Sequence, residues 1–304
     1  MSYLGIKFST RLSQSLSEDS RIEDCIFDSF SWSGSGGGVY VDGNFKLSVS
    51  GCRFLDCVAG MEGGGLFVET LVSCSSRNAF VSCGCSQRGF GSYQRGKEAN
   101  ENNFSSYFSC ESRSTSMVCY ASFAFRYSLS KAKDINGSYL SSVGRECGYH
   151  CYDGPESHLM FMTFSCCSGP FISSFHCETA QCQIQENICT TNSTLTTSIA
   201  VLYNGYHLAK NLVLCESTLF VSRYHGYDGS MVFQNCNFGS PQIRDFWLET
   251  EGCLFDCNQE ILNQHFKDQY VCFHERTVRF TLKDIGVNVV PMAVYPISLL
   301  IITK

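Results

Sequence analysis

The chain has 304 residues, of which 16% are charged, and its net charge is −6 at pH 7. This acidic balance, without any run of Lys and Arg, excludes the basic surface of a nucleic-acid-binding protein. The charged fraction is below the typical value of about 25%, whereas Phe (24 residues) and Gly (26 residues) are abundant and Pro (5 residues) is scarce. The composition is that of a β-rich chain, and long helical periodicity is absent.

Residues 1–20 are polar, with no acidic residue before Glu18. They lack the apolar core of a secretory signal, although their Ser and Arg content leaves a transit peptide open. We expect this segment to be a polar N-terminal lead-in, and the localisation is not assigned by any signal sequence.

Two adjacent segments then repeat in register at a spacing of 27 residues: IEDCIFDSFSWSGSGGGVYVDG (22–43) and VSGCRFLDCVAGMEGGGLFVET (49–70). A period of this length indicates a solenoid. The aligned positions are Cys25 with Cys52, Phe27 with Phe54, and the glycine triplet Gly36, Gly37, Gly38 with Gly63, Gly64, Gly65.

Within each repeat, Cys and Phe alternate along a strand-like run, which indicates that one strand face is buried. In a parallel β-helix, equivalent residues of successive coils stack about 4.8 Å apart, so the same residue type recurs at the same phase. The glycine triplets suit sharp corners that require positive φ or close approach of the neighbouring coil. The sequence therefore predicts an all-β, right-handed parallel β-helix over residues 21–284, as a single elongated domain.

Weaker copies of the repeat follow. Phe80-Val81-Ser82-Cys83 matches Phe54-Leu55-Asp56-Cys57 at a spacing of 26 residues, and the Cys-x-Phe form returns at Cys236 and Cys253. Between these copies, Gly84–Asn103 is rich in Gly, Ser and charge, so we expect a loop excursion between coils.

Twenty cysteines occur in the chain. Because many recur beside Phe at a repeating phase, a ladder of buried free thiols is one interpretation; a disulfide framework is the alternative. The densest patch runs from Cys147 to Cys189 and includes His150 and His176. A structural zinc site there is a third interpretation, but no Cys-x-x-Cys pair supports it.

Candidate sites for chemistry are few. Asp42 and Glu69 form an in-register acidic pair, which either shares a calcium ion or lies at solvated strand ends. A nucleophile elbow and a phosphate-binding glycine loop are both absent from the sequence. We therefore assign no catalytic, metal-binding or cofactor-binding residue and expect no cofactor.

One later segment combines a basic residue, an acidic residue and two aromatic rings between Arg223 and Gly229. Such rings can stack on sugars, so this segment is predicted as a candidate ligand surface, formed by Tyr224, His225, Tyr227 and Asp228.

The last segment, residues 285–304, contains an uncharged run from Ile285 to Thr303. Its length permits a membrane span. Its Val and Ile content, together with Pro291 and Pro296, favours β-strands or a hydrophobic end cap instead. Both interpretations stay open.

The Cys-x-Phe strand followed by Gly-Gly-Gly-aromatic-Val resembles the repeats of polymorphic-membrane-protein-type right-handed β-helix proteins, especially their Cys-rich protist families. This chain has Gly38-Val39 and Gly65-Leu66 where the bacterial motif has Ala-Ile. The resemblance implies a surface or adhesion protein at the cell surface or outside the cell.

The sequence thus predicts a non-enzymatic β-helix scaffold that binds carbohydrate or protein, with no nucleic-acid partner. Membrane association and oligomeric state are left open. One alternative is a carbohydrate-active enzyme, a polysaccharide lyase or glycoside hydrolase, on the same fold; another is a degenerate fragment of a larger repeat protein.

Overall fold

The computed structural model describes the following residues: 1–113, 121–143, 146–152, 157–169, 171–176, 183–191, 194–195, 200–202, 205–210, 213–214, 221–223, 229–238, 248–254, 288–292 and 299–303. Backbone contacts divide the chain into two units, Met1–Asp256 and Cys257–Lys304.

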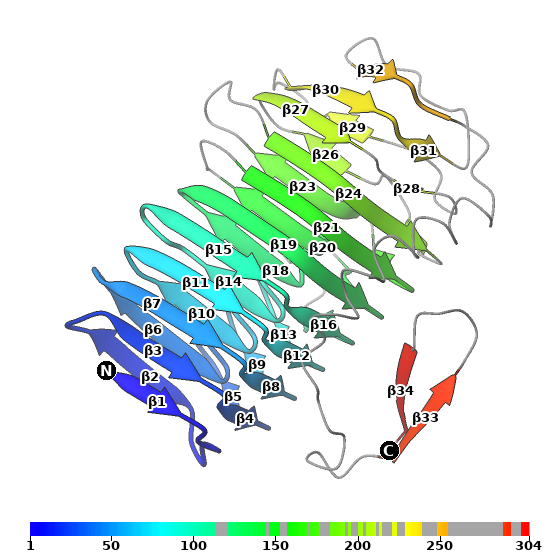
Figure 1. Ribbon diagram of the computed structural model, residues 1–304. Helices are drawn as coiled ribbons and strands as arrows, with labels where there is room; N and C mark the ends of the chain where they lie inside the picture. The colour runs from blue at the N-terminus through cyan, green and yellow to red at the C-terminus, as the bar shows by residue number, and fades with distance from the viewer. Residues whose placement is uncertain are drawn as a thin grey trace. The chain divides into compact units, whose positions relative to one another are not determined.

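The first unit is built on a nine-stranded parallel sheet that takes one strand from each successive turn (Figure 1). Its strands, in order, are β2 (Leu12–Leu16), β6 (Val39–Gly43), β10 (Leu66–Glu69), β14 (Ser92–Gln94), β18 (Phe123–Arg126), β20 (Glu146–Tyr152), β23 (Phe171–His176), β26 (Ala200–Leu202) and β29 (Val221–Arg223).

A 17-stranded parallel sheet follows in each turn, in two columns that merge in the long strands β19 (Leu129–Ser138), β21 (Ser157–Ser165) and β24 (Gln183–Thr191). The first column contains β1 (Ser2–Leu4), β3 (Ser20–Glu23), β7 (Lys46–Ser50), β11 (Val72–Ser76), β15 (Ala99–Asn103), β27 (Gly205–Lys210), β30 (Gly229–Gln234) and β32 (Leu248–Glu251). The second contains β4 (Ile26–Asp28), β8 (Arg53–Leu55), β12 (Ala79–Val81), β16 (Ser106–Phe108), β28 (Val213–Leu214) and β31 (Asn237–Phe238).

Short strands close the turns. They are β5 (Ser31–Trp32), β9 (Val58–Ala59), β13 (Gly84–Cys85) and β17 (Glu111–Ser112) in a four-stranded sheet, and β22 (Ser168–Gly169) with β25 (Thr194–Leu195). Each turn therefore passes through three strand columns or more before it returns one strand spacing further on. The predicted all-β parallel solenoid is confirmed.

The solenoid includes residues that the sequence placed outside it. Strand β1 pairs with β3, and β2 pairs with β6, so residues 1–20 already contribute strands to the stack. The polar composition of this segment follows from its position: in β2 only the two end residues, Leu12 and Leu16, are buried.

The expectation of a loop excursion at Gly84–Asn103 is wrong. This segment forms β13, β14 and β15, all paired with both neighbouring turns. The polar composition of this segment led to the wrong prediction because the interior of the solenoid is itself polar here. Asn102 donates to the Tyr107 hydroxyl at 2.8 Å, and Ser73 donates to Gln94 at 2.8 Å. All four side chains are buried. Hydrogen bonds between these side chains offset part of the cost of burying them, although Gln94 Nε2 and Asn102 Oδ1 have no hydrogen-bond partner among the described residues.

A ladder of stacked aromatic rings fills the interior. Phe27 pairs with Phe54, and Phe54 with Phe80, as direct Cα partners on adjacent strands. The ring centroids lie 5.0 and 4.7 Å apart, and the stack continues to Tyr107 at 4.7 Å. All four side chains are buried, so the recurrent Phe fixes the register between turns.

Two left-handed corners recur in each turn, and the residue after the corner is often Cys. The residues with positive φ at the first corner are Asp24, Gly51, Arg77, Phe104, Asp134, Phe161, Asn235 and Gly252, and those at the second corner are Ser29, Asp56, Ser82, Ser109, Tyr139 and Cys166. Left-handed backbone costs most L-residues roughly 1–2 kcal/mol, which explains why Gly, Asp, Asn and Ser are common there.

The cysteines that follow these corners link successive turns. Cys52 donates to the Ser50 carbonyl at 3.4 Å in its own turn and to the Ile22 carbonyl at 3.5 Å in the preceding turn. Cys57 bonds Leu55 and Phe27 in the same way. Cysteine is small enough for the crowded corner and has a weak donor for the corner carbonyls, of which Ser50 and Leu55 also accept a backbone N–H.

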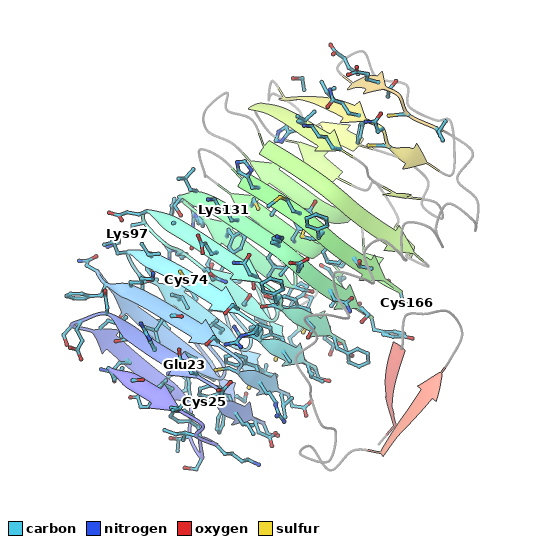
Figure 2. All side chains as sticks on the ribbon, viewed as in Figure 1. Glu23, Cys25, Cys74, Lys97, Lys131 and Cys166 are labelled. Atoms are coloured by element: carbon cyan, nitrogen blue, oxygen red, sulfur yellow. The ribbon has the colours of Figure 1, made fainter. Side chains whose placement is uncertain are left out.

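The thirteen cysteines whose side chains the structure describes are thiols without a disulfide; Cys25, Cys74 and Cys166 are labelled in Figure 2. Ten of them are buried. Burial raises the pKa of Cys83 well above its ordinary value, so its reactive thiolate is suppressed as well as inaccessible.

We expect iodoacetamide to label the ten buried thiols at least about 100-fold more slowly than Cys74, because each requires local opening of the solenoid. Burial, and then the Glu101 carboxylate, raise the pKa of Cys74, so its own labelling accelerates as the pH rises. Peptide mass spectrometry before and after unfolding measures each site. Thiols that stay unlabelled in denaturant until a reductant is added would show that disulfides exist instead.

The glycine triplets form a corner where adjacent turns nearly touch. Gly36 and Gly63 have φ of 71° and 65°, which favours glycine. Gly37 and Gly64 do not have positive φ; a Cβ on Gly64 would lie 2.0 Å from the Phe90 carbonyl oxygen. Close approach is therefore the reason for the second glycine of each triplet.

The second unit is described only in two strands, β33 (Asn288–Met292) and β34 (Leu299–Thr303), which pair antiparallel. The described parts of the apolar tail at residues 285–304 are thus β-strands. Among the described residues, no helix is long and apolar enough to cross a membrane.

Candidate ligand-binding surface

The corner between the nine-stranded and 17-stranded sheets presents the most distinctive group of exposed side chains. Strand β18 ends at Arg126 and β19 begins at Leu129, and between them Tyr127 has φ of 75°. Positive φ is rare for a bulky residue. Tyr127 and Leu129 are 45% and 43% exposed, so this corner holds two large apolar groups in water.

Two arginines pack on the Tyr127 ring. The guanidinium of Arg126 lies 4.2 Å from the ring centroid, and that of Arg95 lies 5.4 Å from it. Arg95 also forms an ion pair with Glu69 at 3.2 Å. Cation–π contacts of this kind are worth about 0.5–1 kcal/mol at exposed sites, so they hold the ring in place without burying it.

On the adjoining sheet face lies a recess of about 310 Å³, which is at the lower end of the volumes of small-ligand sites. It is lined by Leu129, Ser130, Lys131, His158 and Met160. Lys131 on β19 and His158 on β21 are direct Cα partners. We call Arg95, Arg126, Tyr127 and these five lining residues the corner surface.

Lys131 belongs to a row of stacked residues, one from each turn, that starts in earlier turns. Cys74 pairs with Glu101, and Glu101 with Lys131; Cys74 and Lys131 are labelled in Figure 2. The Cys74 thiol lies 4.0 Å from Oε2 of Glu101, so this carboxylate is engaged with the preceding turn. No ion pair within the described part of the chain engages the Lys131 ammonium.

A second arginine–aromatic group lies at the first turns. The Arg11 guanidinium lies 4.8 Å from the Trp32 ring and 5.4 Å from the Tyr40 ring, and it donates to the Ser35 carbonyl at 2.8 Å. Burial lowers the pKa of Arg11 from its ordinary value. Because its donors are used by the glycine-rich loop, this arginine fixes the loop and leaves Trp32, 49% exposed, at the surface.

The acidic pair Asp42 and Glu69 is brought together in register, as the sequence predicted. Each carboxylate already has a partner: Asp42 accepts from the Tyr40 hydroxyl at 3.1 Å, and Glu69 is paired with Arg95. Among the described residues, no group of three or more His, Cys, Asp or Glu side chains could hold a metal ion, and this includes the described part of the Cys147–Cys189 patch.

The predicted ligand segment containing Tyr224, His225, Tyr227 and Asp228 lies outside the described residues. The repeat residues Cys25, Phe27, Cys52 and Phe54 all point into the core and are buried.

Comparisons of the chain with protein-family models, curated proteins and solved structures found no match. The resemblance of the repeat to polymorphic-membrane-protein-type repeats therefore stays a prediction.

Sequence reasoning missed the corner surface. Arg126-Tyr127 and Leu129-x-Lys131 sit in a stretch without Cys-x-Phe, so no repeat phase identified which side chains point outward. The available signal was the alternation from Leu129 to Lys133, in which the small residues Ser130 and Ala132 separate longer side chains, together with His158-x-Met160 further on. Matching these two segments needed the strand register.

Proposed function

We propose that this protein is a non-enzymatic β-solenoid scaffold that binds carbohydrate or protein ligands at a cell surface. The observation that supports a binding role is the corner surface: Tyr127 and Leu129 are exposed beside Arg126, and no ion pair among the described residues engages Lys131. Aromatic rings and cationic groups bind a ligand without catalysing a reaction. Because the sheet that carries them is rigid, less conformational entropy is lost on binding.

The arrangement of acids favours binding over catalysis. Glycosidases use two carboxylates about 5–9.5 Å apart, one of them as an acid or base. Here Glu62 is paired with Arg88 at 2.8 Å, Glu69 with Arg95 and Glu111 with Arg113. Each of these carboxylates is already engaged by a guanidinium, which leaves it less available to a substrate as an acid or a base.

We expect the purified chain to bind a subset of glycans on an array of polysaccharides and oligosaccharides without cleaving them. Reducing-end and unsaturated-uronate assays on each bound glycan measure turnover. Turnover that is abolished by Asp42→Asn or Glu69→Gln would replace the scaffold with a carbohydrate-active enzyme. Absence of binding to every glycan would remove carbohydrate from the proposal.

A further inference from the structure

The recess beside Tyr127 combines cationic and apolar chemistry in a small volume. Lys131 and His158 are Cα partners on adjacent parallel strands, so their side chains start about 4.8 Å apart. Leu129 and Met160 belong to the same lining. Two nitrogen groups beside two apolar side chains suit a ligand with one anionic group and one apolar face.

The charge of Lys131 is available to such a ligand. Its side chain is exposed, and no contact within the described residues engages the ammonium. The nearest acid in the column, Glu101, is engaged by Cys74 in the preceding turn. Lys133, two residues further along β19, adds a further positive charge, and its ammonium lies 5.6 Å from the centroid of the Phe161 ring. Lys131 and Lys133 thus place two cationic groups at the recess of a protein whose net charge is −6, with Glu101 one strand before Lys131 and Glu186 paired with Met160 on the next strand.

The surroundings indicate which kind of anion fits. A volume of about 310 Å³ accommodates one six-membered sugar ring with its substituents, but not an extended side of a folded protein. Tyr127, two residues before the lining residue Leu129 in the chain, is 45% exposed. Sugar rings have an apolar face that packs on such groups, and their acidic substituents accept charge-assisted hydrogen bonds.

We propose that the recess binds an acidic sugar residue of a glycan. Lys131 and His158 contact its carboxylate or sulfate, Leu129 and Met160 contact the ring, and Tyr127 contacts the next sugar along the chain. This inference rests on the proposed function and specifies the ligand class and the site.

The test uses isothermal titration of the full chain with three ligands: a galacturonate oligomer, its methyl ester, and a sulfated galactan oligomer of the same length. The methyl ester keeps the backbone and removes the charge. We expect the galacturonate oligomer to bind at least about tenfold more tightly than its ester, as one charge-assisted hydrogen bond implies. The affinity for the sulfated oligomer shows whether the recess requires a carboxylate or accepts any anionic group.

Variants then locate the site. Lys131→Gln should weaken binding of the acidic oligomer about five- to tenfold and leave the ester unaffected, whereas Lys131→Arg retains most of the affinity. Lys46→Gln is the matched control, because Lys46 is an exposed lysine in the Leu129 column of the same sheet, three strands earlier. It removes the same charge outside the recess.

The outcomes separate the two proposals. Equal loss in Lys131→Gln and Lys46→Gln, or no loss in either, while the glycan still binds, would overturn the recess as the site and leave the binding scaffold intact. Equal affinity for the acidic oligomer and its ester would overturn the anionic ligand class. Failure to bind any glycan would overturn the acidic-sugar site and would leave protein ligands alone in the proposed function.

Discussion

Gly64→Ala is expected to destabilise the solenoid by about 4 kcal/mol or more. A Cβ on Gly64 would lie 2.0 Å from the Phe90 carbonyl oxygen and 2.6 Å from that of Gly84. Both atoms belong to the backbone of the next turn, so neither can move without separating paired strands. Gly64 N also donates to the Gly89 carbonyl at 3.1 Å, a bond that the displacement would lengthen. Urea unfolding followed by circular dichroism measures the loss.

Gly5→Ala is the matched control for this substitution. Gly5 has φ of 63°, and a Cβ there would meet no atom within 4 Å, so only the left-handed backbone cost of roughly 1–2 kcal/mol applies. If Gly64→Ala costs no more than Gly5→Ala, the turns do not approach as closely as the structure shows at the triplet.

Phe54→Ala should destabilise the protein by about 3–5 kcal/mol. The Phe54 ring is fully buried between Phe27 at 5.0 Å and Phe80 at 4.7 Å. Truncation removes both stacking contacts and leaves a cavity in the middle of a rigid ladder, which cannot collapse because the strands on either side are fixed by pairing. The shift in the urea midpoint, at an unchanged m-value, reports the effect.

Phe45→Ala provides the comparison for aromatic truncation at the surface. Phe45 is 36% exposed and lies between β6 and β7, so its loss should cost less than about 1 kcal/mol. If Phe54→Ala lowers the free energy of unfolding by less than Phe45→Ala does, the Phe54 ring does not pack in the core as the structure shows.

The corner surface could not be predicted from the sequence. The rings that repeat with Cys, such as Phe27 and Phe54, could be assigned to the interior, because an inward ladder must present the same residue type in every turn. Tyr127, Lys131 and His158 belong to no repeat. Outward side chains are not selected for stacking, so they leave no periodic signal, and only the pairing of β19 with β21 shows which of them are neighbours.

The buried polar side chains of β14 and β15 were likewise not predictable from the sequence pattern. Asn100 and Asn102 are fully buried although alternation alone would place polar residues outside. Asn102 donates to Tyr107, five residues further on in the same turn, and Asn100 donates to Ser128 in the next turn at 2.9 Å. A one-dimensional pattern cannot show whether a buried amide has a partner.

The sequence by itself determined the period, the parallel solenoid and the inward positions of Cys25, Phe27, Cys52 and Phe54, because stacked turns impose the same steric demand at each repeat. The tertiary structure alone decided how close the turns approach at Gly64, which acids are paired with arginine, and that Lys131, His158 and Met160 line one recess. Those relations depend on the register between turns of unequal length, and the register is set by packing across the whole core.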